Sequence, residues 1–173
     1  MLLFVNLLKF EENKLKKIIV STLVGLIGAA SLSAADCVMV KDLNVQFKNA
    51  STVYSDSSEM KEIREYAQFL KETDLYTVIE GHTSSLAGAK YNYDLSSKRA
   101  TKVRSELIRL GVSPSKVRAM GFGESSPLYN NNTESGAAQN RRVIGEVFNT
   151  AAELSNYIAS EKSRISTIKY NEQ

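Results

Sequence analysis

The sequence is poor in the side chains on which most active sites and metal centres depend. Among its 173 residues there is one cysteine, Cys37, and one histidine, His82. One cysteine cannot form a disulfide within the chain, and a cysteine and a histidine so far apart do not supply the usual zinc ligands. A serine-hydrolase triad would have to use His82, and no paired catalytic carboxylates stand in a recognisable motif. The sequence therefore argues against a metal centre and against a hydrolase.

A strong excess of charge is also missing. The chain carries 22 Lys and Arg against 19 Asp and Glu, a formal net charge of +3, and part of that surplus lies before Asp36. Proteins that bind nucleic acid need a much stronger basic footprint, so nothing here indicates that class. With 43% hydrophobic and 24% charged residues and no internal repeats, the chain is typical of one globular domain with extensions.

Residues 1–35 are typical of a secretory signal peptide. Lysines within 14–17 precede an apolar run at 18–30, and Ser33 and Ala35 occupy the positions where a signal peptidase prefers small side chains. We therefore expect cleavage after Ala35. The apolar run is shorter than the about 20 residues of a comfortable membrane span, although an uncleaved anchor is the alternative.

Two features near this segment leave alternatives open. The apolar prefix 1–13 suggests a spurious upstream extension, with the true start nearer Leu15. Cys37 suggests lipidation, but a lipidated cysteine follows a small residue, and Asp36 is neither small nor neutral. We expect an unmodified thiol, or one that pairs with another chain.

Hydrophobic spacing predicts alternating strands and helices within residues 38–148. The expected strands are 38–47, 75–80, 116–122 and 141–148, and the two expected helices precede residue 74 and residue 111. Asp56 followed by Glu59 resembles a capping box at the start of the first helix, and Gly111 is a good stop for the second.

Two further segments are polar. Residues 123–136 are expected to form a long loop, and residues 149–173 a partly helical tail. The tail has a weak apolar stripe, made of Leu154, Ile158, Ile165 and Ile168. It would pack on the domain or engage a partner.

The stretch from Ile79 to Ala100 carries the candidate site. It begins as a strand, passes through a loop of small residues at 84–88 and enters the second helix. Asn92 and Arg99 are seven residues apart, so they project from the same face of that helix. Arginine offers a planar fork of donors that pairs two-pronged with a carboxylate, although a solvated helix arginine is the commoner alternative.

Two blocks of residues in this order resemble a known family. They are Gly81, His82, Thr83, Tyr91, Asn92, Leu95, Ser96, Arg99 and Ala100, followed by 121–124, Pro127 and 140–143. Together they resemble the OmpA-like C-terminal domain, the peptidoglycan-binding module of Gram-negative envelope proteins. The resemblance covers residues 38–148. It implies an α/β sandwich with a mixed sheet and helices packed on one face.

The resemblance also implies a function and a set of site residues. The family is not catalytic and needs no cofactor; its ligand is the diaminopimelate of the peptidoglycan stem peptide, bound without a covalent bond. Arg99 matches the family's carboxylate-binding arginine, with Arg141 and Asn92 in support. Thr83 precedes Ser84, which stands where the family has an aspartate for the ligand's ammonium group.

Ser84 is the most informative departure from the family pattern. Serine cannot neutralise an ammonium, and a lost ionic hydrogen bond costs about 1–3 kcal/mol, which predicts roughly 10- to 100-fold weaker binding. Ala50 and Lys48 also replace polar family residues, an asparagine and an aspartate. Glu80 is a candidate to substitute for the missing acid.

The sequence thus predicts a secreted peptidoglycan-binding module in the periplasm, with an association to the outer membrane as a further expectation. The alternative is a degenerate module that acts through other envelope proteins, with the tail as a contact site. A wall hydrolase is the third hypothesis, and the single histidine argues against it.

Overall fold

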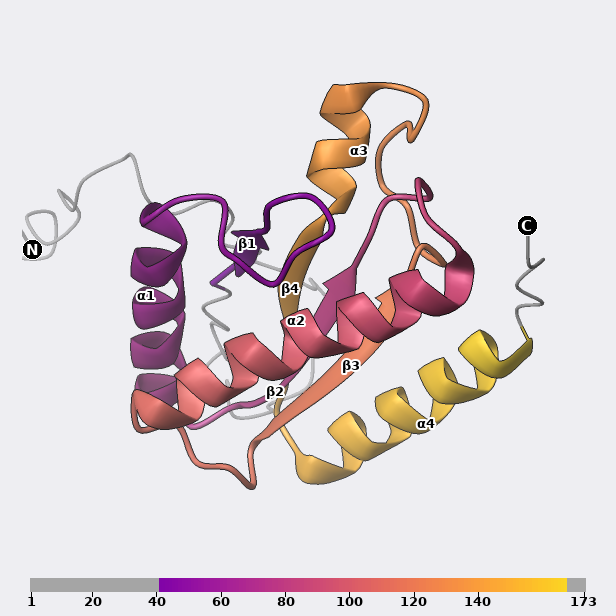
Figure 1. Ribbon diagram of the computed structural model, residues 1–173. Coiled ribbons are helices and arrows are strands. Elements are labelled where there is room, and N and C mark those ends of the chain that lie inside the picture. The colour runs from indigo at the N-terminus through magenta and orange to yellow at the C-terminus, as the bar shows by residue number, and fades with distance from the viewer. Residues whose placement is uncertain (1–40, 168–173) are drawn as a thin grey trace, which may run out of the picture. The chain divides into compact units, whose positions relative to one another are not determined.

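The computed structural model describes residues 41–167, and every structural statement below concerns that part of the chain (Figure 1). The expected signal peptide at 1–35, Cys37 and Ile168 lie outside the described residues. None of the helices within 41–167 is both long and apolar enough to cross a membrane.

A four-stranded mixed sheet forms the centre of the domain. Its strands are β1 (Asn44–Gln46), β2 (Tyr76–His82), β3 (Val117–Gly123) and β4 (Arg142–Phe148), in the spatial order β1-β4-β2-β3. Strands β2 and β3 are parallel, and β4 is antiparallel to both of its neighbours. The mixed α/β fold predicted from the sequence is confirmed.

The helices are α1 (Ser58–Thr73), α2 (Ala89–Arg109), α3 (Glu134–Asn140) and α4 (Ala151–Thr167). The short helix α3 lies across the end of the segment expected to be a long polar loop. It is capped by Thr133, whose side chain accepts a hydrogen bond from the Gly136 amide at 3.1 Å. Gly111 has a φ of 94°, in keeping with its predicted role as the stop of α2.

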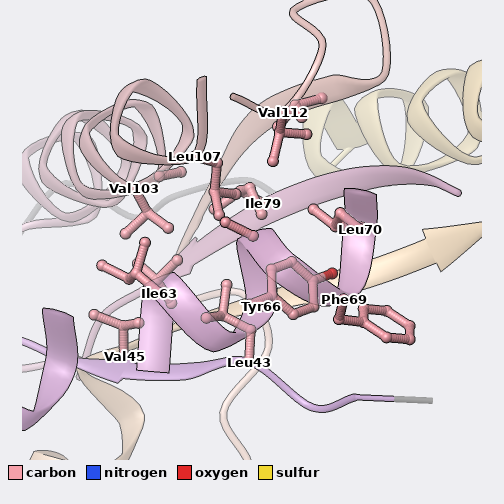
Figure 2. Close-up of a cluster of buried hydrophobic side chains, with 14 of the residues drawn as sticks. Leu43, Val45, Ile63, Tyr66, Phe69, Leu70, Ile79, Val103, Leu107 and Val112 are labelled. Carbon is pink, nitrogen blue, oxygen red and sulfur yellow. The ribbon is translucent and has the colours of Figure 1, made fainter. Parts of the chain in front are cut away.

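The main core lies between one face of the sheet and helices α1 and α2 (Figure 2). Alternate residues of a strand point to opposite faces, so Val45, Ile79 and Val143 point toward these helices while their neighbours do not. Tyr66 of α1 is fully buried, and its hydroxyl pairs with the Thr77 hydroxyl at 2.8 Å.

Helix α2 sits directly on the backbone of β2 and β3. A Cβ atom added at Gly81 would overlap the Ser96 carbonyl, and one added at Gly121 would overlap the Ser97 hydroxyl. Only glycine permits so close an approach at these two positions. The contact fixes α2 against the ends of two strands, where the candidate site lies.

The tail folds back on the opposite face of the sheet. Leu154 and Ile165 of α4 are buried against Val78, Met120 and Phe122, in a second apolar cluster. Helices α1 and α2 of the domain therefore share one face, as expected, and the tail packs on the domain, one of its two expected roles, with α4 on the opposite face. The physical reason is that β2 and β3 also have apolar side chains on this second face, and the apolar stripe of the tail buries them.

The predicted capping box at the start of α1 does not form. Asp56 accepts a hydrogen bond from the Ser58 amide at 2.6 Å, but the Glu59 carboxylate turns away and accepts from the Gln46 amide of β1 at 2.9 Å. Glu59 also accepts from the Ser55 hydroxyl. It thus ties α1 to the edge strand and to the loop that follows it.

Candidate functional site

A cavity of about 170 Å³ opens where the loop after β1, the loop after β2, helix α2 and the start of β4 meet. It is lined by Asn49, Ala50, Thr83, Ser84, Leu86, Ala87, Tyr91, Asn92, Leu95, Arg99 and Arg141. All five residues predicted from the sequence to bind ligand are in this lining. They come from positions far apart in the chain and meet because α2 is pressed against the ends of β2 and β3.

Arg99 is the most deeply buried of these residues, with no exposed surface. Its Nε donates to the Ser51 carbonyl at 2.8 Å and its Nη2 to the Lys48 carbonyl at 3.0 Å, while the guanidinium carbon lies 5.1 Å from the centre of the Phe47 ring. The alternative of a solvated helix arginine is therefore wrong.

The two loop carbonyls change how Arg99 can bind an anion. They occupy the edge of the guanidinium formed by Nε and Nη2, and Nη1 is buried without a partner. A two-pronged pairing with a carboxylate would have to use Nη1 with the remaining hydrogen of Nη2. Arg99 thus has two tasks: it holds the loop after β1 and presents one free nitrogen.

Arg141 lines the cavity from the C-terminal end of α3. Its Nη2 pairs with the Glu134 carboxylate at 3.2 Å, and that carboxylate belongs to a side chain that is 82% exposed. The Nε and Nη1 atoms of Arg141 are buried and have no hydrogen-bond partner. A buried donor without an acceptor costs about 1–3 kcal/mol, so these atoms call for an acceptor from a ligand.

The cavity is electrostatically one-sided. Burial and the nearby charge of Arg141 lower the pKa of Arg99 to about 10, so Arg99 remains a cation at neutral pH. None of the residues that line the cavity is an aspartate or a glutamate. Two cations without a counter-charge in the lining favour an anionic ligand.

Thr83 and Ser84 supply hydroxyl groups at the floor of the loop after β2. Both residues are buried, and the Thr83 amide donates to the Gly123 carbonyl at 2.8 Å, which pins the loop to the end of β3. The Thr83 hydroxyl is buried without a partner, so it can donate to or accept from a ligand.

Asn92 holds the loop as well as lining the cavity. Its side-chain nitrogen donates to the Ala87 carbonyl at 2.8 Å and to the Glu124 carboxylate at 2.5 Å. These bonds employ the donors that the sequence assigned to a ligand. Its contribution to binding therefore remains a prediction, and its observed role is to shape the loop at 84–88.

The structure places the remaining sequence candidates differently. Ala50 lines the cavity in a left-handed conformation, with a φ of 47°, whereas Lys48 contributes its backbone carbonyl to Arg99. Glu80 lies on the α4 face of the sheet, where its carboxylate accepts from the Tyr157 hydroxyl at 2.6 Å. The suggestion that Glu80 replaces the missing acid of the cavity is therefore wrong, because β alternation turns its side chain away.

His82 also lies on the α4 face. Its ring stacks on Phe122 with 5.1 Å between centroids, and its Nε2 is 3.6 Å from the Glu80 carboxylate, too far for a hydrogen bond. Burial lowers the pKa of His82, which keeps the ring neutral at pH 7. The buried ring therefore packs on this face of the sheet, and neither ring nitrogen has a hydrogen-bond partner. Within residues 41–167, no group of three or more His, Cys, Asp or Glu is arranged to hold a metal ion.

Sequence analysis missed the apolar rim of the cavity and a second hollow next to it. Leu86 is 61% exposed and Tyr91 is 49% exposed at the rim. A more open hollow of about 440 Å³ adjoins the cavity and shares Ala50, Tyr91 and Leu95 with it. The signal available in the sequence was a leucine within the loop of small residues and a tyrosine shortly after it.

Comparison with known proteins matches residues 46–141, more than half of the chain, to the model of the OmpA family. Outer membrane porin F of Pseudomonas fluorescens is 37% identical over 107 residues, which cover 61% of this chain and 32% of that protein. The peptidoglycan-associated lipoprotein of Pseudomonas putida is 36% identical over 93 residues, covering 51% of this chain and 56% of that protein. The chain therefore spans from about a third to somewhat over half the length of these relatives.

Solved structures share the fold. The peptidoglycan-associated lipoprotein of Burkholderia pseudomallei superposes with a TM-score of 0.58 at 29% identity, covering 61% of this chain and 89% of that one. All three of these relatives carry the names of outer-membrane or peptidoglycan-associated proteins, and none of the three names is that of an enzyme.

Proposed function

The chain belongs to the OmpA family, and on that premise we propose that its domain at 38–148 binds the peptide stem of peptidoglycan without catalysis and without a covalent bond. The bound group is a carboxylate of diaminopimelate. Residues 1–35 direct the chain to the periplasm, where the domain associates with the cell wall near the outer membrane. Two relatives described above are named for their association with peptidoglycan, which supports this ligand.

One observation carries the proposal. Four buried polar atoms without a protein partner belong to residues that line one cavity: Nη1 of Arg99, Nε and Nη1 of Arg141, and the Thr83 hydroxyl. They are four of the eight such atoms in residues 41–167, and the other four belong to Tyr54, His82 and Arg142. Buried polar groups are nearly always paired in folded proteins, so four unpaired atoms around one cavity are candidates for pairing with a ligand. A carboxylate supplies acceptors for several of these atoms at once.

The shape of the site fits the rest of such a ligand. Diaminopimelate joins its two charged ends through an aliphatic chain, and the exposed Leu86 and Tyr91 at the rim offer apolar surface to that chain. The adjoining hollow offers room for further parts of the stem. The cavity by itself is too small for a polymer, so binding would engage one residue of the stem at a time.

Retention on purified sacculi tests the proposal. Arg141→Gln removes a cation and two unpaired donors from the cavity, and we expect retention to fall about 10- to 100-fold because charge-assisted hydrogen bonds are lost. Arg118→Gln, which removes the same charge from an exposed position on β3, is the matched control and should retain normally. Equal retention of both variants would refute the proposed site.

The second candidate function is a degenerate module that binds envelope proteins instead of the wall. The absence of an acid from the cavity lining favours it, because such a cavity leaves the ammonium end of a free diaminopimelate unanswered. In that case sacculi would retain neither the wild-type chain nor its variants, while cross-linking in cells would capture an envelope protein.

A further inference from the structure

The cavity offers donors to an anion and no counter-charge to a cation. Its two guanidinium groups, Arg99 and Arg141, are close enough for the charge of Arg141 to affect Arg99. An ammonium bonded to the carbon next to a bound carboxylate would enter the same cavity. Like charges a few ångströms apart in a partly buried site repel strongly. A ligand with a free amino group therefore gains binding free energy from its carboxylate and loses binding free energy through the repulsion of its ammonium.

Three acids that contact the lining or the adjoining hollow are either paired with a cation or lie outside the lining. Glu134 pairs with Arg141 from the solvent side, at 3.2 Å. Glu124 accepts a bond from Asn92 at 2.5 Å, and neither glutamate is in the cavity lining. The adjoining hollow contains Asp94, but this aspartate pairs with Lys90 at 3.0 Å and shares the hollow with Lys98.

Acylation of the amine removes the conflict. An acylated nitrogen is neutral and keeps one N–H, which is a hydrogen-bond donor. The Thr83 hydroxyl, buried and unpartnered, and the Ser84 hydroxyl can accept from such an N–H. The acyl group would extend into the adjoining hollow, which shares three lining residues with the cavity.

We propose that this cavity selects a carboxylate whose neighbouring nitrogen is acylated, in preference to a carboxylate beside a free ammonium. The proposal rests on the proposed function. In peptidoglycan this chemistry has two sources: the side-chain end of a diaminopimelate whose amine has been acylated in a cross-link, and the carboxyl terminus of a stem peptide. The domain would thus recognise cross-linked or terminal positions of the wall and pass over uncross-linked diaminopimelate amines.

Calorimetric titration of the purified chain with a matched pair of probes tests the selectivity. Both probes are diaminopimelate with one end blocked as acetamide and amide; the other end is a free amino carboxylate in the first probe and an N-acetylated carboxylate in the second. We expect the acetylated probe to bind about tenfold tighter or better. Acetyl-D-alanyl-D-alanine is a third probe: tighter binding than that of the acetylated probe assigns the site to stem termini, weaker binding assigns it to cross-links, and equal binding means that the site accepts both.

Ser84→Asp supplies the internal control, because it adds one carboxylate to the same cavity. This variant should bind the free-amine probe tighter than the acetylated one, which reverses the order. If the wild-type chain binds the free-amine probe equally well or better, the selectivity is refuted and the proposed function stands. If no probe binds in a manner that depends on Arg141, both fall.

Discussion

Arg141 and Arg142 are neighbours in the chain and both are almost fully buried, yet they serve opposite faces of the sheet. Alternation along β4 sends the Arg142 side chain to the face opposite the cavity, where it is only 3% exposed. Arg142 donates to the Ser126 carbonyl at 3.3 Å. Burial lowers the pKa of Arg142, and the nearby Tyr129 and Glu80 oppose that lowering. Arg141 instead lines a cavity whose lining has no acid.

The difference separates a structural use of buried charge from a binding use. On the α4 face, the Glu80 carboxylate accepts a hydrogen bond from the Tyr157 hydroxyl of the tail and also lies near Arg142. The charged groups on that face therefore have partners within the same chain. On the cavity face, Arg99 keeps one unpaired buried donor and Arg141 keeps two, whereas Arg142 on the α4 face keeps one, its Nε. A protein that leaves buried donors unpaired gives up stability there, and a ligand that pairs them recovers it as affinity.

The strongest way to break this comparison is Arg99→Ala, because Arg99 takes part in both uses. The variant leaves the Ser51 and Lys48 carbonyls without their donor, at about 1–3 kcal/mol each, and also removes the free Nη1. We expect the free energy of unfolding to fall by several kcal/mol, measured by urea denaturation, and retention on sacculi to disappear.

Arg99→Lys separates the two losses. A lysine can reach one loop carbonyl but cannot hold both and present a third nitrogen, so we expect partial recovery of stability and little recovery of binding. Full recovery of binding with lysine would show that any cation at this position suffices, and that the planar fork is not required.

How far the sequence predicts this site depends on the reach of each interaction. Helix periodicity places Asn92 and Arg99 on one face of α2, so their shared position in the lining was predictable. The carbonyls that engage Arg99 belong to a loop about fifty positions earlier in the chain. Backbone carbonyls leave no trace in residue type, so no pattern in the sequence could reveal that Arg99 is also a loop clamp.

Two errors of local prediction have the same cause. Glu59 has the spacing of a capping residue. Its carboxylate instead accepts a hydrogen bond from the backbone amide of Gln46 on the edge strand. Glu80 is adjacent to the loop of the site, but strand alternation decides its direction and the tail supplies its partner. Glu80 and Tyr157 are 77 positions apart in the chain, so their pairing could not be predicted from neighbouring residues.

Tyr157→Phe sharpens the comparison from the other face. Burial and the hydrogen bond to Glu80 raise the pKa of Tyr157, so the hydroxyl stays protonated and donates at 2.6 Å. Its removal leaves a buried carboxylate with one partner fewer, and we expect unfolding free energy to fall by about 1–3 kcal/mol with no change in wall retention. Glu80→Gln in the same chain should recover part of the loss, as thermal denaturation would record. A loss of retention in the Tyr157→Phe variant would mean that the two faces are coupled.

The smallest expected effect comes from Glu134→Gln, which changes only the outer partner of Arg141. The Glu134 side chain is 82% exposed, so its ion pair contributes no more than about 1 kcal/mol to stability and partly offsets the charge that Arg141 offers to the cavity. Removing the carboxylate should therefore leave the melting temperature almost unchanged and tighten the binding of an acetylated diaminopimelate probe by less than about fivefold. Glu153→Gln, an exposed glutamate at the start of α4, carries the same change in net charge away from the cavity and should have no effect on that titration. Weaker binding in the Glu134→Gln variant would mean that the ion pair orients Arg141 toward the ligand. The orientation of the Arg141 guanidinium would then contribute more to binding than the removal of the nearby negative charge.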